Sequence, residues 1–139
     1  MNQSYENHRR FHPLFHYILS LLLVLTLVGA IWFVIRNGIS LSTILILAIV
    51  IILAIMFLLI RQYPLKAQDR AIRAEENLRH YVFTGKLLDA RLTMGQIIAL
   101  RFASDAELPE LSDKAASQNL SPNEIKKQIT NWKADYYRV

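Results

Sequence analysis

Residues 14–35 read LFHYILSLLLVLTLVGAIWFVI, and residues 39–60 read ISLSTILILAIVIILAIMFLLI. Each run is 22 residues long and contains no Asp, Glu, Lys or Arg. A helix of this length extends about 33 Å, which is enough to cross a hydrocarbon core of about 30 Å. Only Arg36, Asn37 and Gly38 separate the runs, and Asn and Gly tolerate the positive φ of a tight turn. The sequence therefore predicts two transmembrane helices in an antiparallel hairpin.

A secretory signal peptide is the competing interpretation of the first run, because Arg9 and Arg10 precede it. The apolar part of a signal peptide is typically about 7–15 residues long, and a small-residue cleavage site follows it. This run continues to residue 35 and no A-x-A site follows. We therefore expect a retained membrane span.

The composition of the whole chain excludes several classes of protein. The 139 residues are 53% apolar and 19% charged, with no cysteine and a net charge of +5. A disordered tail would have fewer large aliphatic residues, and a disulfide-stapled scaffold would need cysteines. The apolar excess lies in the two runs, so the chain combines a membrane part with a water-exposed part.

Positive charges near the ends of the runs predict the orientation. The N-terminal segment (residues 1–13) holds two, the turn holds one, and residues 61–80 hold five. Basic residues stay on the cytoplasmic side, so both termini are expected in the cytoplasm. Anionic lipid headgroups attract such residues by about 1 kcal/mol each, and we expect them to contact Arg9, Arg10, Arg61, Lys66, Arg70 and Arg73.

Residues 61–139 show helical spacing and no alternating strand pattern. Pro64 is predicted to interrupt the second span, and a new helix is predicted over residues 65–84, ending at Gly85. Pairs at i,i+4 are expected between Asp69 and Arg73 and between Glu75 and Arg79. The apolar face of this helix is formed by Ala67, Ala71, Ala74, Leu78, Tyr81 and Val82.

Three capping boxes predict three further helix starts, at Thr93, Ser104 and Ser121. Pro109 falls after the first turn of the second of these helices, so that helix is expected to begin late or to bend. The apolar stripe of the last helix is Ile125, Ile129, Trp132 and Tyr136. The fold class is therefore all-α: a transmembrane hairpin (residues 14–60) followed by a small cytoplasmic bundle of about four helices (residues 61–139).

Small residues predict the seam between the two spans, because they let membrane helices approach closely. With the turn centred on Asn37, antiparallel pairing sets Thr26 opposite Ala48 and Ser20 opposite Ala54. A channel is a weaker interpretation of the same residues. It would need an oligomer with a pore lined by Ser20, Thr26, Ser42 and Thr43.

Histidines are the candidate metal ligands. His8, His12 and His16 recur every four residues, and His80 is the fourth histidine of the chain. Imidazoles bind metals and haem, but Pro13 argues against one continuous helix through His12. The alternative is an interfacial segment with its rings at headgroup level, and we favour that interpretation.

No motif of catalysis or cofactor binding occurs in the chain. There is no cysteine, no G-x-S-x-G elbow, no P-loop and no G-x-G-x-x-G, so we expect no enzyme, no catalytic residue and no cofactor. Basic residues of the last helix suit nucleic acid poorly because acidic residues dilute them, so no nucleic-acid partner is expected. The basic residues are Lys126, Lys127, Lys133 and Arg138, and the acidic ones are Asp113, Glu124 and Asp135.

Distinctive strings lie outside the spans: SYENH (4–8), RFHP (10–13), ENLRHY (76–81), QIIALRFASD (96–105), and the stretch from LSP (120–122) through NW (131–132). On these strings the whole chain resembles an uncharacterised bacterial family of small two-span membrane proteins, classed as a domain of unknown function. The resemblance implies a bacterial cytoplasmic membrane and a helical cytoplasmic tail, and it implies no activity.

The same strings suggest a docking surface between the N-terminal segment and the cytoplasmic part. In this hypothesis Asn7, His8, Arg10 and His12 lie near Arg79, His80 and Tyr81. The function expected from the sequence is a membrane-anchored interaction or scaffold module that binds an unknown protein partner or a second copy of itself. The alternative is a metal- or haem-linked accessory subunit of a membrane enzyme that uses the histidines.

Overall fold

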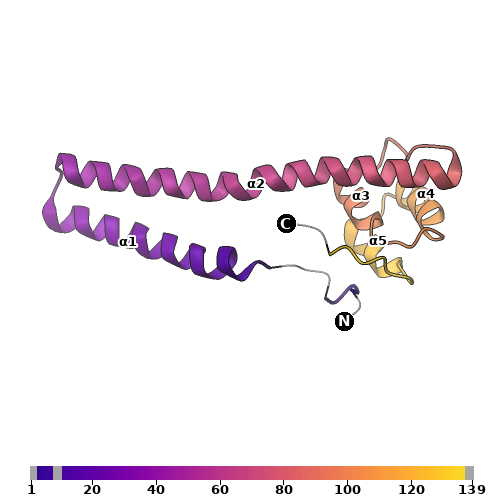
Figure 1. Cartoon of the computed structure of the whole chain (residues 1–139), viewed down its shortest axis with the longest axis horizontal. Coiled ribbons are helices and arrows are strands. Elements are labelled where there is room, and N and C mark those ends of the chain that lie inside the picture. Colours follow the sequence, from indigo (N-terminus) through magenta and orange to yellow (C-terminus); the bar gives the residue numbers. More distant parts are fainter. Residues whose placement is uncertain (1–2, 8–10, 137–139) are drawn as a thin grey trace. The chain divides into compact units, whose positions relative to one another are not determined.

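The computed structural model of the protein describes residues 3–7 and 11–136. Within these residues the chain forms five α-helices and one π-helical segment, and no β-strand. The prediction of an all-helical chain is confirmed. The contacts divide the chain into two compact units, Arg10–Tyr63 and Met1–Arg9 with Pro64–Val139, and each unit is described by itself (Figure 1).

The first apolar run is helical throughout, and the second is helical from Leu41 onward. A π-helical segment (Leu14–Leu19) leads directly into α1 (Ser20–Asn37), and α2 (Leu41–Thr84) contains the second run. The Ser20 hydroxyl donates to the Phe15 carbonyl at 3.1 Å, across the wider turn of the π-helix. Both helices are long and apolar enough to cross a membrane.

The connection between α1 and α2 begins later than predicted, because Arg36 and Asn37 are still helical. Gly38, with a φ of 72°, ends the helix and donates its amide to the Val34 carbonyl at 2.9 Å. The start of α2 is capped reciprocally. The Ser40 amide donates to the Thr43 hydroxyl at 2.8 Å, and the Thr43 amide donates to the Ser40 hydroxyl at 3.3 Å. Hydrogen bonds thus satisfy both helix ends locally.

Side chains of α1 and α2 meet along part of their length. Phe15 of the π-helical segment stacks on Phe57 with 4.5 Å between ring centroids. Ser20 and Ala54 are both half-buried, as the predicted seam requires. Thr26 and Ala48 are both exposed, and their pairing stays a prediction. The Thr26 hydroxyl donates to the carbonyl of Leu23 in its own helix, at 2.9 Å.

Pro64 lies inside α2, so the prediction that it interrupts the helix is wrong. A proline removes one backbone donor and favours a bend, and a helix with packing on either side can continue through it. The predicted end is confirmed. Gly85 adopts a φ of 71°, and its amide donates to the Tyr81 carbonyl at 2.8 Å.

The remaining helices share one apolar core with the end of α2. They are α3 (Met94–Leu100), α4 (Leu108–Gln118) and α5 (Pro122–Gln128), and α3 packs against both α4 and α5 (Figure 1). Ile72 supplies the contribution of α2 to this core. The largest side chains with almost no exposure in it are Leu100, Phe102, Leu108 and Ile125.

Two of the three capping boxes form as predicted. At the start of α3 the Thr93 amide donates to Gln96 Oε1 at 2.7 Å, and the Gln96 amide donates to the Thr93 hydroxyl at 3.3 Å. Ser121 caps α5 in the same way. At Ser104 a turn forms instead, and α4 begins late, at Leu108, with its proline in the first turn. The expectation of a late start is therefore confirmed.

The last helix is shorter than its apolar stripe suggests. α5 ends at Gln128, so the prediction that Trp132 and Tyr136 continue its stripe is wrong. The chain instead runs beside the loop after α3, where the Lys133 amide donates to the Phe102 carbonyl at 2.8 Å and Ala103 pairs with Trp132 in an antiparallel bridge. The backbone hydrogen bond from Lys133 and the bridge at Trp132 take the place of the helical hydrogen bonds that a longer α5 would make.

Candidate functional site

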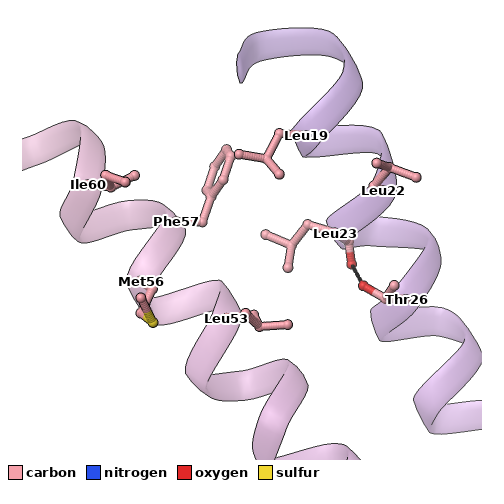
Figure 2. A pocket seen from close by; sticks show the side chains of 8 residues that line it. All are labelled: Leu19, Leu22, Leu23, Thr26, Leu53, Met56, Phe57 and Ile60. Carbon is pink, nitrogen blue, oxygen red and sulfur yellow. Dashed lines mark hydrogen bonds between the residues drawn. The ribbon is translucent and has the colours of Figure 1, made fainter. Parts of the chain in front are cut away.

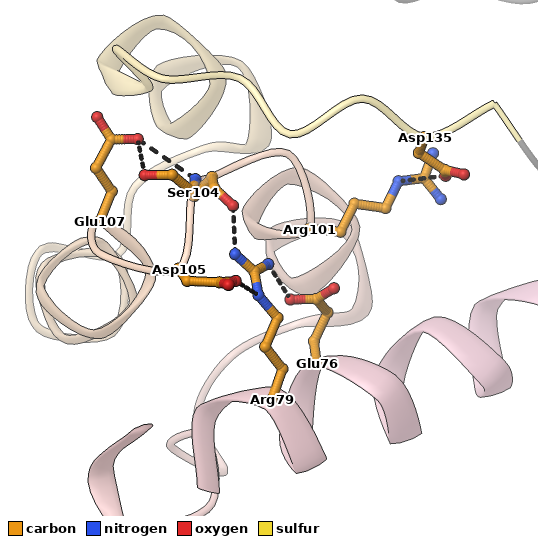
Figure 3. A network of polar contacts seen from close by, with 8 residues as sticks. Glu76, Arg79, Arg101, Ser104, Asp105, Glu107 and Asp135 are labelled. Carbon is orange, nitrogen blue, oxygen red and sulfur yellow. Dashed lines mark hydrogen bonds and ion pairs between the residues drawn. The ribbon is translucent and has the colours of Figure 1, made fainter. Parts of the chain in front are cut away.

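Arg79 is the centre of a polar network between α2 and the loop after α3. Its side chain is only 9% exposed. Nη1 donates to Glu76 Oε2 at 2.9 Å, Nε donates to Asp105 Oδ1 at 2.6 Å, and Nη2 donates to the Ala103 carbonyl. Figure 3 shows Glu76 and Arg79 projecting from α2 toward this loop. Two of these charge-assisted bonds tie the helix to the loop after α3, and the third, to Glu76, stays within α2.

The predicted i,i+4 pairs of this helix do not form. Arg79 pairs with Glu76, three residues before it, and not with the exposed Glu75. In the described part of the chain, Asp69 and Arg73 form no ion pair either. The reason is that the Arg79 side chain points toward the core, where the Ala103 carbonyl and the Asp105 carboxylate accept its other hydrogen bonds.

Glu76 is a buried carboxylate. Burial raises the pKa of its side chain above the ordinary 4.5, and the attraction of Arg79 opposes this rise without cancelling it. The charged form of Glu76 thus depends on the guanidinium beside it.

Asp135, near the end of the described chain, contacts both Arg101 and the N-terminal segment within the same unit. Arg101 Nε lies 3.4 Å from Asp135 Oδ2, and its guanidinium lies 4.6 Å from the centre of the Phe102 ring. The Asp135 amide donates to Gln3 Oε1 at 2.8 Å, and Gln3 itself is buried. A segment before the spans therefore packs against residues near the other end of the chain.

Glu107 collects hydrogen bonds from two segments. Its carboxylate accepts from the Ser104 hydroxyl at 3.1 Å and from the amides of Thr130 and Asn131 at 3.1 Å each. Partial burial raises the pKa of Glu107, but the bonds from Thr130, Asn131 and Ser104 outweigh it and hold the pKa below the ordinary 4.5. Glu107 thus fastens the stretch after α5 to the start of α4.

A groove of about 440 Å³ lies beside Arg79. It combines charged side chains with apolar ones, which is the chemistry of a protein contact surface. Its lining residues are Glu75, Glu76, Leu78, Arg79, Val82, Phe83, Asp105 and Lys133.

The three histidines that the structure describes occupy local structural positions. His80 is buried, and its Nδ1 lies 2.7 Å from the Lys86 carbonyl and 3.1 Å from the Thr84 hydroxyl, at the end of α2. The His12 amide donates to Nδ1 of His16 at 3.1 Å. His8 lies outside the described residues. Across residues 3–7 and 11–136, no group of three His, Cys, Asp or Glu side chains is arranged to hold a metal ion.

The predicted headgroup contacts stay a prediction. Lys66, Arg70 and Arg73 are exposed on α2, Arg61 is half-buried, and Arg9 and Arg10 lie outside the described residues.

The predicted docking surface also stays a prediction. Asn7 accepts the Ser4 amide at 2.6 Å within its own turn, and His8 and Arg10 lie outside the described residues. On α2, Arg79 and His80 point into the core of their own unit, whereas Tyr81 is 53% exposed.

A second groove, of about 290 Å³, lies between α1 and α2 and is almost wholly apolar. Figure 2 shows its lining, which is Leu19, Leu22, Leu23, Thr26, Leu53, Met56, Phe57 and Ile60. The hydroxyls of the suggested pore residues Ser20, Thr26 and Thr43 each donate to a nearby backbone carbonyl. Ser42 is exposed. This lining suits acyl chains or another apolar helix.

Gln3 and Glu107 carry contacts that the sequence did not predict. Their partners lie 132 and 23 or 24 residues away, and no local pattern marks such pairs. The one local signal was Glu107 at the third position of the Ser104 capping box, where its carboxylate was expected to serve the helix start.

The comparisons with known proteins give one result. No curated protein and no solved structure matches the chain significantly. A family model described as a family of unknown function (DUF6526) matches residues 1–139. The chain, as its distinctive strings suggested, belongs to this family of unknown function.

Proposed function

We propose that the chain is a bacterial inner-membrane protein in which α1 and the first part of α2 form an antiparallel transmembrane hairpin. The observation that carries the proposal is the exposure of its apolar helices. Only 6% of the most apolar window of Leu14–Asn37 and 11% of that of α2 is buried. The core helix of a water-soluble protein would be mostly buried, and an apolar surface of this length in water would drive aggregation.

The excess of Lys and Arg outside the turn supports a cytoplasmic location for both termini. The second unit is then a small helical module at the inner face of the membrane. We propose that this module is a protein-interaction or scaffold element, and the mixed ionic and apolar groove beside Arg79 supports this role.

Cysteine labelling tests the membrane part cleanly because the chain has no cysteine of its own. Asn37→Cys marks the exposed last residue of α1, next to the turn, and Ser117→Cys marks the exposed end of α4. In spheroplasts, a membrane-impermeant maleimide should label the first variant at once and the second only after permeabilisation. The reverse pattern would overturn the orientation, and loss of the chain from carbonate-washed membranes would overturn membrane insertion.

A further inference from the structure

The part of α2 that follows Pro64 is buried on its polar side and exposed on its apolar side. The face against the core carries Ile72, Glu76 and His80, all buried. The opposite face carries the apolar residues that the sequence predicts as one stripe. Leu78 is 64% exposed, Tyr81 is 53% exposed, and the alanines of the stripe are exposed as well. We call Ala67, Ala71, Ala74, Leu78 and Tyr81 the outer stripe.

The spacing of the outer stripe is that of a coiled coil. Its members follow one another at intervals of four, three, four and three residues. Apolar residues that recur every 3.5 residues on average line the a and d positions of paired helices. Ala71 and Leu78 then take a positions, and Ala67, Ala74 and Tyr81 take d positions. The three alanines allow a close approach of a second helix.

The charges beside the outer stripe identify the partner as another α2. In this register Arg70 occupies a g position and Glu75 the following e position. In a parallel pair, g of one helix lies beside the following e of the other, so Arg70 meets Glu75 of the second copy twice, by symmetry. An antiparallel pair would instead bring the two Glu75 side chains toward each other. Both residues are exposed, and neither forms an ion pair with another described residue.

We propose that two copies of the chain associate in parallel through the outer stripe of α2. This inference rests on the proposed function in one respect: two copies inserted in one bilayer with the same orientation begin this segment at the same membrane face. The core contacts of Glu76 and Arg79 point toward the loop after α3 and use no residue of the outer stripe, so each copy keeps its own module intact (Figure 3).

Disulfide crosslinking of the full chain in native-like membranes tests the proposal. Ala74→Cys places two thiols opposite each other at a d position, so oxidation should give a dimer. Arg73→Cys is the matched control, since residue 73 is also exposed but points about 100° away on the helix. It should give little dimer at the same protein density.

Charge exchange tests the parallel register. Arg70→Glu or Glu75→Arg alone should lower the crosslinked fraction of Ala74→Cys several-fold. The combination of both should restore it, because the two pairs form again with their signs reversed. Equal crosslinking at residues 73 and 74, a crosslink only to a different protein, or no rescue by the double exchange would overturn the proposal.

Carbonate washing of the same membranes separates this inference from the proposed function. A chain retained in the membrane without a specific crosslink at residue 74 refutes the dimer and leaves the membrane anchor standing. A chain that washes out refutes the anchor, and the crosslinking pattern still decides whether the outer stripe pairs.

Discussion

Replacing Arg79 with methionine should destabilise the second unit severely. The guanidinium is bonded to Glu76, to Asp105 and to the Ala103 carbonyl, and its side chain is 9% exposed. Methionine keeps most of the aliphatic length but removes all three donors. The Glu76 carboxylate, with a side chain 6% exposed, then stays buried without a counter-ion.

The expected loss follows from the burial of the pair. Removing one partner of a buried ion pair typically costs about 3–5 kcal/mol. The contact with Asp105 adds little, because that side chain is 57% exposed and such pairs contribute at most about 1 kcal/mol. A domain of this size has a total stability of roughly 5–15 kcal/mol, so the variant should be close to unfolding.

Urea unfolding of the full chain in a mild detergent measures this loss. The ring centroids of Trp132 and the core residue Phe102 are 5.1 Å apart, so Trp132 fluorescence reports on the second unit. The other tryptophan, Trp32, is replaced by phenylalanine in every variant. The matched control is Arg73→Met, on the same helix but exposed, which should change the free energy of unfolding by no more than about 0.5 kcal/mol.

Glu76→Gln completes the test. Burial raises the pKa of Glu76, so this carboxyl favours the folded state fully below pH 4.5 and loses that contribution as the pH rises through the raised value. The Gln variant has no charge to bury and leaves Arg79 bonded to Asp105 and the Ala103 carbonyl, so it should lose much less stability than Arg79→Met at pH 7. It should also recover most of the loss in the Arg79→Met background. This reasoning would be refuted if Arg79→Met lowered the free energy of unfolding only slightly at pH 7, or if Glu76→Gln restored none of the loss.

Three further predictions concern local features of the second unit, each measured by the same Trp132 unfolding assay. Gly85→Ala should cost about 1–2 kcal/mol, because φ is +71° and a Cβ there meets no neighbour within 4 Å, so the penalty is conformational; Gly85→Asn should cost less. Ser121→Ala should cost about 1 kcal/mol through loss of the cap of α5, whereas alanine at the exposed Ser117 should be nearly neutral. Glu107→Gln should flatten the pH dependence of stability below pH 4.5. The pKa of Glu107 is lowered in the folded state, so its carboxylate stabilises the fold above pH 4.5 and loses this contribution as the pH falls. An unchanged pH dependence in acid would contradict this role.

Local chemistry made much of the helix pattern readable from the sequence. The capping boxes at Thr93 and Ser121 and the stop at Gly85 are contacts between residues no more than four apart. The two apolar runs are also recognisable, because each has 22 residues without an Asp, Glu, Lys or Arg. Such features need no knowledge of what lies across the fold.

The face of α2 that packs against the core of the second unit could not be predicted from the sequence. Helical spacing marks an apolar face on α2, but the structure turns that face outward and buries Glu76 and His80 instead. The distances along the chain explain the difference, since Arg79 finds its partners at Ala103 and Asp105, 24 and 26 residues later.

The sequence by itself determined that the chain is helical, where α3 and α5 begin, where α2 ends, and that two helices are long and apolar. Only the tertiary structure decided which side of α2 faces the core, where α5 stops, and that Gln3 meets Asp135. The physical reason is that periodicity specifies a stripe on a helix but not its partner. A buried guanidinium with three acceptors can hold the polar side inward, which leaves the apolar stripe available to a second molecule.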